Sequence, residues 1–216
     1  MPPTLWRVAC LLAAAMFISE VHAVEQDKVQ LIEDFDATWK DGAWQFSNGA
    51  EFPGAKGSFE RAKDAAHAGE FGGKLNFDFA GGGNYVAAIR HLAGAPDIKS
   101  VRLWLKNPAG NRVTFRYTDP TGQTLQKAVV LPPYGEWAEI NIECFNWDTH
   151  WGGANDGTAH GPPAQIAILV ENDGRKQGAL LFDDIHFVLD KPVVSVWTYA
   201  AAKFEPAEGW HASSVG

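Results

Sequence analysis

Short runs of alternating apolar and polar residues constrain the fold of this chain more than any other feature of its sequence. They recur along most of its length, and clusters of Gly, Pro, Asn and Asp separate them. An apolar residue at every second position is typical of a strand with one buried face, whereas no long stretch keeps the spacing of an amphipathic helix. The pattern predicts an all-β, antiparallel β-sandwich. The expected strands are 31–36, 44–47, 74–79, 85–91, 98–106, 112–118, 124–131, 136–143, 165–171 and 179–189.

The alternation also assigns faces in two successive strands. Every second residue of 101–105 and of 113–117 is apolar, and we expect these side chains in the core. The intervening positions place Trp104 among cations and hydroxyl groups, including Arg116, on the outside of a sheet. We interpret this surface as either a ligand platform or a cation–π cluster. The turn residues at 107–111 predict a hairpin between the two strands.

The N-terminal residues have the pattern of a secretory signal peptide. Arg7 precedes an apolar run at 8–18, and small residues end the segment at Ala23. We therefore expect a secreted or periplasmic protein, and no membrane anchor, since the run is shorter than the ~20 residues that span a bilayer. The expected organisation is a signal peptide at 1–23, a sandwich domain at 24–190 and a tail or linker at 191–216.

Charge and cysteine content narrow the classes of partner. The formal net charge is −8, which argues against nucleic acids and anionic membranes as partners and favours a neutral polymer. We expect a monomer. Cys10 lies in the signal segment, so only Cys144 remains and no internal disulfide is expected. Cys144 shares an apolar phase with its neighbours, which indicates a core residue rather than a nucleophile.

The Gly-rich segment 146–163 gathers polar and aromatic side chains on one loop. Indole faces stack on the C–H faces of sugars, while carboxamide, carboxylate and imidazole groups bond to sugar hydroxyls. We interpret the segment as a sugar-binding loop; the alternative is that it folds on itself and caps the sandwich. The spacing of its two histidines matches no familiar zinc motif. The candidate ligand-binding residues are Trp104, Trp147, His150, Trp151, Asn155, Asp156 and His160.

Two carboxylates fall on positions that the alternation assigns to the core. Asp183 shares the phase of the apolar residues in 179–189, and Glu33 shares that of its neighbours in 31–36. A buried, ionised carboxylate needs a charged partner, hydrogen bonds or a cation. The alternatives to a cation are an Arg or Lys partner for Asp183, or a register slip that puts Asp184 inward. We expect a structural Ca²⁺ between the first and last strands, with the ligands Glu33, Asp34, Asp36, Gly73 and Asp183.

Several short motifs follow one another along most of the chain up to Leu189. They are 33–36 with Trp39 and Trp44, 72–75, 119–123, 135–137 and 182–187. In this order they resemble the jelly-roll carbohydrate-binding modules of the galactose-binding-like type, which accompany secreted bacterial glycoside hydrolases.

The resemblance implies a jelly roll in which a structural calcium joins the first and last strands. It carries Asp36 and Asp183 over as metal ligands, with Glu33, Asp34 and Asp184 as near alternatives. It also implies sugar binding on a sheet face or in the loops at one edge, and a glycoside hydrolase domain as a companion.

The sequence thus favours a non-catalytic carbohydrate-binding protein over two other classes. An enzyme on the same sandwich would need an acid and a base across a cleft, for which Asp148 and Asp156 are the pair in a glycosidase. A polysaccharide lyase would use His150 or Tyr117 as base and Arg116 to stabilise charge. The third class is a structural or adhesive module whose aromatic loop contacts another protein.

Overall fold

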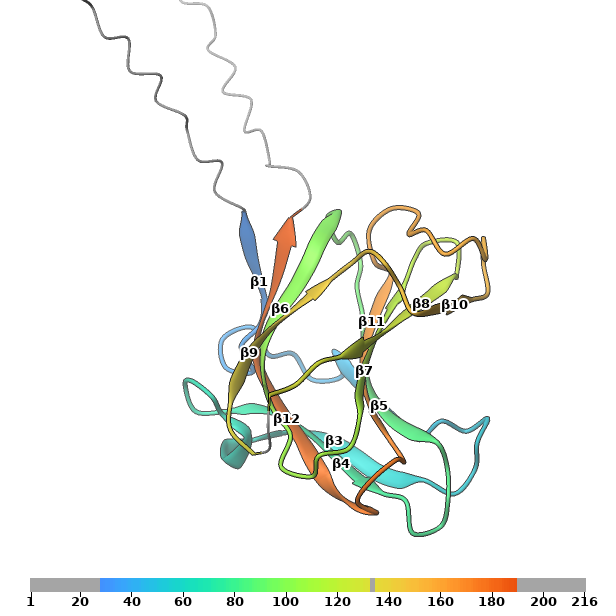
Figure 1. Ribbon diagram of the computed structural model, residues 1–216. Coiled ribbons are helices and arrows are strands. Elements are labelled where there is room, and N and C mark those ends of the chain that lie inside the picture. The colour runs from blue at the N-terminus through green and yellow to red at the C-terminus, as the bar shows by residue number, and fades with distance from the viewer. Residues whose placement is uncertain (1–27, 133–134, 190–216) are drawn as a thin grey trace, which may run out of the picture.

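The structure is a computed structural model that describes residues 28–132 and 135–189. The expected signal peptide and the tail at 191–216 lie outside the described residues. Two antiparallel six-stranded sheets pack face to face as a β-sandwich (Figure 1), which confirms the predicted fold class. Within the described ranges, no helix has the length and apolarity needed to cross a membrane.

The first sheet contains the beginning and the end of the described chain. Its strand order is β3-β4-β12-β6-β9, and β1 pairs with β12 beside this path. Its strands are β1 (Val29–Glu33), β3 (Lys56–Ala62), β4 (Gly72–Asp78), β6 (Ile98–Lys106), β9 (Ala138–Glu143) and β12 (Gln177–Leu189). Because β1 and the end of β12 are hydrogen-bonded neighbours, the two ends of the domain lie side by side (Figure 1).

The second sheet has the order β10-β8-β7-β11-β5-β2. Its strands are β2 (Trp44–Ser47), β5 (Tyr85–His91), β7 (Val113–Thr118), β8 (Thr124–Val129), β10 (Thr149–Trp151) and β11 (Gln165–Glu171). One short 3₁₀ helix, η1 (Lys63–Ala65), precedes β4. The turn at 107–111 connects β6 in the first sheet to β7 in the second, so the predicted hairpin is wrong.

Two strands were not predicted, and both lack a strong apolar alternation. Most of β3 is exposed at the edge of the first sheet, and Phe59 is its partly buried aromatic contact with the core. All three residues of β10 are exposed. Edge strands bury little apolar surface, so their sequence carries a weak signal.

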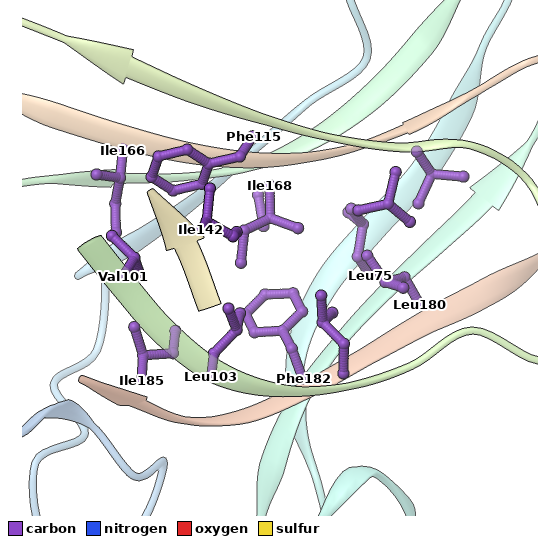
Figure 2. Packing of buried hydrophobic residues seen from close by; sticks show 14 of the residues in the cluster. Leu75, Val101, Leu103, Phe115, Ile142, Ile166, Ile168, Leu180, Phe182 and Ile185 are labelled. Carbon is purple, nitrogen blue, oxygen red and sulfur yellow. The ribbon is translucent and has the colours of Figure 1, made fainter. Parts of the chain in front are cut away.

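The core fills the space between the sheets as the alternation predicts. Figure 2 shows Leu103 and Phe182 of the first sheet close to Phe115 and Ile168 of the second, with Leu75 farther along the core, and all are nearly fully buried. Each such side chain contributes about 1.5–3 kcal/mol by leaving water. An aromatic cluster at one end includes Phe59 stacked on Phe182, with ring centroids 5.5 Å apart.

A bulge in β12 changes the predicted face of Asp183. The pairing register of β12 with β6 shifts between Asp183 and His186, and Asp184 has a positive φ of 50°. The core-facing residues are therefore Phe182 before the bulge and Ile185 after it, while Asp183 points to the outer side. The predicted phase was wrong because strict alternation does not continue through a bulge. Asp183 is nevertheless fully buried.

Candidate binding face

The outer face of the second sheet has a small apolar floor. The cluster consists of Tyr85 and Ala87 of β5 with Ala167 and Leu169 of β11, and Ile89 packs against it. These residues alternate with core residues along the same strands, so both faces of β5 and β11 are apolar. The side chains of Ala87 and Ala167 are small, so larger groups can lie over this part of the sheet.

Arg116 of β7 lies beside this floor, between two aromatic rings. Its Cζ atom is 4.4 Å from the ring centroid of Tyr85 and 5.1 Å from that of Trp151. Its Nε donates to Oε1 of Gln126 on β8 at 2.8 Å. Each cation–π contact contributes about 0.5–1 kcal/mol at an exposed site, and together these contacts fix the guanidinium on the sheet.

A pocket of about 320 Å³ opens next to Arg116. Phe52, which is 45% exposed, lies at one side, with its ring 6.5 Å from that of Tyr85 in an edge-on arrangement. The pocket combines these aromatic groups with carboxylate and carboxamide side chains. Its lining is Phe52, Asn84, Tyr85, Arg116, Gln126, Leu169, Glu171, Asn172 and Asp173. We call this surface, together with Trp151, the candidate binding face.

Two carboxylates of this face have defined partners. The Tyr85 hydroxyl donates to Oε1 of Glu51, and Thr114 Oγ1 donates to Oε1 of Glu171 at 2.5 Å. The bond from Tyr85 lowers the pKa of Glu51, while burial and then the Glu51 carboxylate raise the pKa of Tyr85. At neutral pH, Tyr85 is therefore a neutral donor that holds an anionic Glu51, and it is unsuited to act as a general base.

The loop 146–163 divides its two predicted tryptophans between different environments. Trp151 is 43% exposed and its ring lies over Arg116 on the candidate binding face. Trp147 is half-buried and packs on Tyr117, with ring centroids 5.6 Å apart, at the edge of the core. Of the two indoles, the structure therefore places only Trp151 where a ligand can reach the outer face of the second sheet.

The polar candidates of the loop largely contact the loop itself. Oδ2 of Asp156 lies 2.9 Å from Nε2 of His160, and Oδ1 accepts from Thr158 N at 3.0 Å. The ring of His150 packs beside the backbone of Gly157. Asn155 is exposed and has a positive φ of 54°, as in a turn. These contacts agree with the alternative that the loop folds on itself.

Trp104 and Arg116, which the sequence assigns to outward positions of successive strands, lie on opposite sides of the sandwich. Trp104 is on the outer face of the first sheet, where the His67 imidazole stacks on it at 3.8 Å with an interplanar angle of 11°. The edge of His67 also meets the Trp137 ring at 5.4 Å. One face of the Trp104 indole is thus covered by His67. Because Trp104 lies on the first sheet, it is not part of the candidate binding face on the second.

Glu33, a predicted metal ligand, has a cation of the protein as partner. It is fully buried, as predicted, and forms an ion pair with Arg90 of β5. Its oxygens also accept from Trp44 Nε1 at 3.2 Å, from Phe35 N at 3.0 Å and from Thr38 Oγ1 at 2.8 Å. The sequence analysis considered an Arg or Lys partner for Asp183, and the structure has an Arg partner at Glu33.

The other acidic candidates accept hydrogen bonds from backbone N–H groups. Asp34 Oδ1 accepts from Asp36 N and Thr38 N, both at 2.9 Å. Asp36 Oδ2 accepts from Glu70 N at 3.0 Å, and its Oδ1 lies 3.5 Å from the Arg61 guanidinium. Short acidic side chains that cap nearby amides in this way stabilise turns.

Asp183 is held by the segment that covers the outer face of the first sheet. Its Oδ2 accepts from His67 N at 2.9 Å and from Ala68 N at 3.2 Å, and its Oδ1 accepts from Asp184 N at 2.8 Å. Burial nevertheless raises the pKa of Asp183. At Gly73, an added Cβ would lie 2.6 Å from the Phe35 ring, so this glycine makes room for an aromatic side chain.

These contacts do not form an oxygen-only cage. Within 28–132 and 135–189, no three His, Cys, Asp or Glu side chains are grouped so as to hold a metal ion. Asp36 and Asp183 both face N–H donors of the segment 67–70, which point hydrogen atoms at the carboxylates. Calcium takes oxygen ligands, whereas the contacts of these two carboxylates in the structure are with N–H groups. Calcium stays a prediction of the sequence.

Several residues suggested for catalysis have partners elsewhere in the structure. Tyr117 is buried and donates to Gly161 O at 2.6 Å, and burial raises its pKa. Tyr117 points to the core whereas Arg116, its neighbour in β7, points outward, so the two side chains lie on opposite faces of the sheet. Asp148 Oδ2 accepts from Ala128 N at 2.7 Å. Cys144 packs against the core, as predicted, and burial raises its pKa to about 12.

The sequence analysis missed most of the candidate binding face. Phe52, Tyr85 and Glu171 were not selected, and Arg116 was considered as a catalytic group or as a neighbour of Trp104, not as a neighbour of Trp151. Phe52 lies in a loop between β2 and β3, so nothing local indicates that it meets Tyr85. The available signal was the run of apolar residues on both faces of β11, which indicates a strand covered on both sides.

Comparisons with known proteins identify the fold. No family model and no curated protein matches the chain. A family 11 carbohydrate-binding module of the cellulosomal cellulase Lic26A-Cel5E of Clostridium thermocellum is similar in structure, with a TM-score of 0.55 and 16% identity over 76% of this chain and 95% of that one. A family 11 module from Clostridium thermocellum in complex with a β-1,3-1,4-mixed-linked tetrasaccharide has a TM-score of 0.56 and 17% identity over 74% and 95%. The chain has the β-sandwich fold of these carbohydrate-binding modules, as the resemblance in its sequence predicts.

Proposed function

We propose that this protein binds a polysaccharide or oligosaccharide on the candidate binding face and does not turn it over. The observation that carries the proposal is the aromatic surface of this face: Arg116 lies between the rings of Trp151 and Tyr85, and the exposed Phe52 ring lies edge-on to Tyr85 beside an apolar floor. A sugar ring needs an apolar surface for its C–H face and directional polar groups for its hydroxyls. This face supplies both.

The polar rim favours a neutral glycan. Glu171 and Asp173 line the pocket, Glu51 bonds to Tyr85 beside it, and the net charge of the chain is −8. Carboxylates accept hydrogen bonds from sugar hydroxyls but repel the carboxylates of uronic acids. The β-1,3-1,4-mixed-linked tetrasaccharide in complex with the Clostridium thermocellum module is a suitable first probe.

The proposal includes the cellular setting that the sequence indicates. The segment 1–23 would be removed on export, giving a secreted or periplasmic protein, and a glycoside hydrolase domain would be its partner. N-terminal sequencing of the exported protein tests the first point, with cleavage after Ala23 as the expected result.

Isothermal titration with a β-1,3-1,4-mixed-linked tetrasaccharide tests the binding face. We expect Trp151→Ala to weaken binding about tenfold, because it removes an exposed aromatic platform from the face. Phe145→Ala is the matched control, since Phe145 is 46% exposed but lies next to Lys127 outside this face.

Equal affinity of the Trp151→Ala variant and the unmodified protein would contradict the proposed face. If the tetrasaccharide does not bind at all, a panel of neutral plant and algal glycans extends the search, and failure of every neutral glycan contradicts carbohydrate binding. Reducing-end and unsaturated-product assays on the same glycans should show no turnover.

A further inference from the structure

A buried polar turn supports the loop that follows Trp151. The turn 119–123 connects β7 to β8, and both Asp119 and Gln123 are almost completely buried within it. Asp119 Oδ1 accepts from Thr121 N at 2.8 Å and from Thr121 Oγ1 at 2.6 Å. Hydrogen bonds among its own residues therefore stabilise the turn, in addition to its contacts with other parts of the chain.

Gln123 connects this turn to the loop 152–160 through both ends of its carboxamide. Its Nε2 donates to Thr158 O at 2.8 Å, and its Oε1 accepts from Gly157 N at 2.9 Å. Asp119 Oδ2 adds a bond from His160 N at 3.1 Å. A buried carboxamide with both groups paired defines one position of the loop backbone relative to β8.

The first residues of the loop also pack tightly on the turn. Ala154 N donates to Thr121 Oγ1 at 3.1 Å. Gly153 has a positive φ of 46°, and an added Cβ would lie 2.2 Å from Gln123 N. The strand β10 that carries Trp151 pairs with β8 over only three residues. Such a short edge pairing is weak, so these contacts contribute much of what holds Trp151 in place.

We propose that Gln123 is a positioning residue that holds Trp151 over Arg116 for ligand binding. It does not face the ligand, because it is fully buried beneath the loop. The inference rests on the proposed function for its effect on affinity, but its effect on the Trp151 side chain is independent of any ligand. Loss of the carboxamide would release the loop 152–160 and change the environment of the indole.

NMR spectra of the free protein test the first step. The Trp151 indole N–H signal is assigned by its loss in Trp151→Phe. In Gln123→Met we expect this signal to shift or broaden, while the buried Trp44 indole, which bonds to Glu33, keeps its position. Gln177→Met is the matched control, since Gln177 is exposed and bonds to Asp78 on the other sheet.

Titration of the same variants with the mixed-linked tetrasaccharide tests the second step. We expect Gln123→Met to lower affinity about tenfold, as Trp151→Ala does, and Gln177→Met to leave it unchanged. If Gln123→Met fails to fold, Gly153→Ala replaces it, because its Cβ would meet Gln123 N and Thr121 Oγ1 and so push the loop away from the turn.

The outcomes separate this inference from the proposed function. An unchanged Trp151 signal in a folded Gln123→Met or Gly153→Ala protein overturns the positioning role. A shifted signal with full affinity overturns its role in binding, provided that Trp151→Ala weakens binding. Full affinity of Trp151→Ala itself contradicts the proposed binding face instead, while the NMR result still decides whether Gln123 positions the indole.

Discussion

Glu33 at the end of β1 and Arg90 of β5 form a buried ion pair, which links the first sheet to the second. The carboxylate is fully buried and the arginine side chain is 14% exposed. Two charges at such a site are costly to bury, and their hydrogen bonds to Trp44 and to the backbone compensate for the loss of water. The alternation in the sequence indicated the burial of Glu33, whereas its partner lies in a strand far along the chain.

Removal of Arg90 should therefore destabilise the protein strongly. We expect Arg90→Met to lower the free energy of unfolding by about 3–5 kcal/mol, because it leaves Glu33 buried without a counter-charge. Arg102→Met is the control, since Arg102 pairs with Glu139 on the exposed surface at 3.3 Å and should cost less than about 1 kcal/mol. Urea denaturation measures both values, and similar losses in the two variants would refute this account of the ion pair.

At the scale of elements, the turn 119–123 shows how side chains in a turn stabilise the ends of the two strands that it connects. Burial acts to raise the pKa of Asp119, but hydrogen bonds from Thr121, from His160 N and from Gln123 outweigh it and lower this pKa below its ordinary value of 3.8. The folded state therefore favours the charged form. The stabilisation from Asp119 is complete above the ordinary pKa and is lost as the pH falls through the lowered value.

Melting curves at decreasing pH test this linkage. We expect the unmodified protein to lose melting temperature as the pH falls below about 4. Above about pH 4, Asp119→Asn should have a lower melting temperature than the unmodified protein, because the NH₂ group of the new amide would face N–H donors. Its melting temperature should also depend less on pH in the acid range. A variant with the same acid profile as the unmodified protein would show that Asp119 does not carry the effect.

The bulge in β12 illustrates what an element-level pattern misses. Alternation is a property of regular strands, and it correctly assigned Val101, Leu103 and Leu105 of β6 to the core. In β12 the positive φ of Asp184 interrupts it, and nothing local in the sequence marks this position. The same limit applies to the turn 107–111, whose residues predict a turn but not that its two strands enter different sheets.

At the scale of the whole molecule, backbone pairing joins the two ends of the domain. The sequence analysis expected a calcium ion to tie the first strand to the last, and the structure pairs β1 with β12 directly. Two of the carboxylates expected to bind the ion, Asp36 and Asp183, accept hydrogen bonds from N–H groups of the segment 67–70. These hydrogen bonds supply a connection across the same region without a cation.

Melting curves with calcium and with a chelator decide between the two arrangements. The observed hydrogen bonds lead us to expect the same melting temperature in both conditions. If calcium raises the melting temperature of the unmodified protein but not that of Asp183→Asn, a calcium ion binds at Asp183. It would also mean that the segment 67–70 turns carbonyl oxygens toward Asp183 when the ion binds.

The sequence by itself determined most of the strands, most of their buried faces and the sandwich class, because alternation and turn chemistry act between neighbouring residues. It also identified Trp151 as a ligand-binding candidate. Only the tertiary structure decided that Trp104 is covered by His67, that Glu33 pairs with Arg90, and that Trp151 shares a face with Arg116. These outcomes depend on which strands pair and which loops meet, and such contacts join residues far apart in the chain.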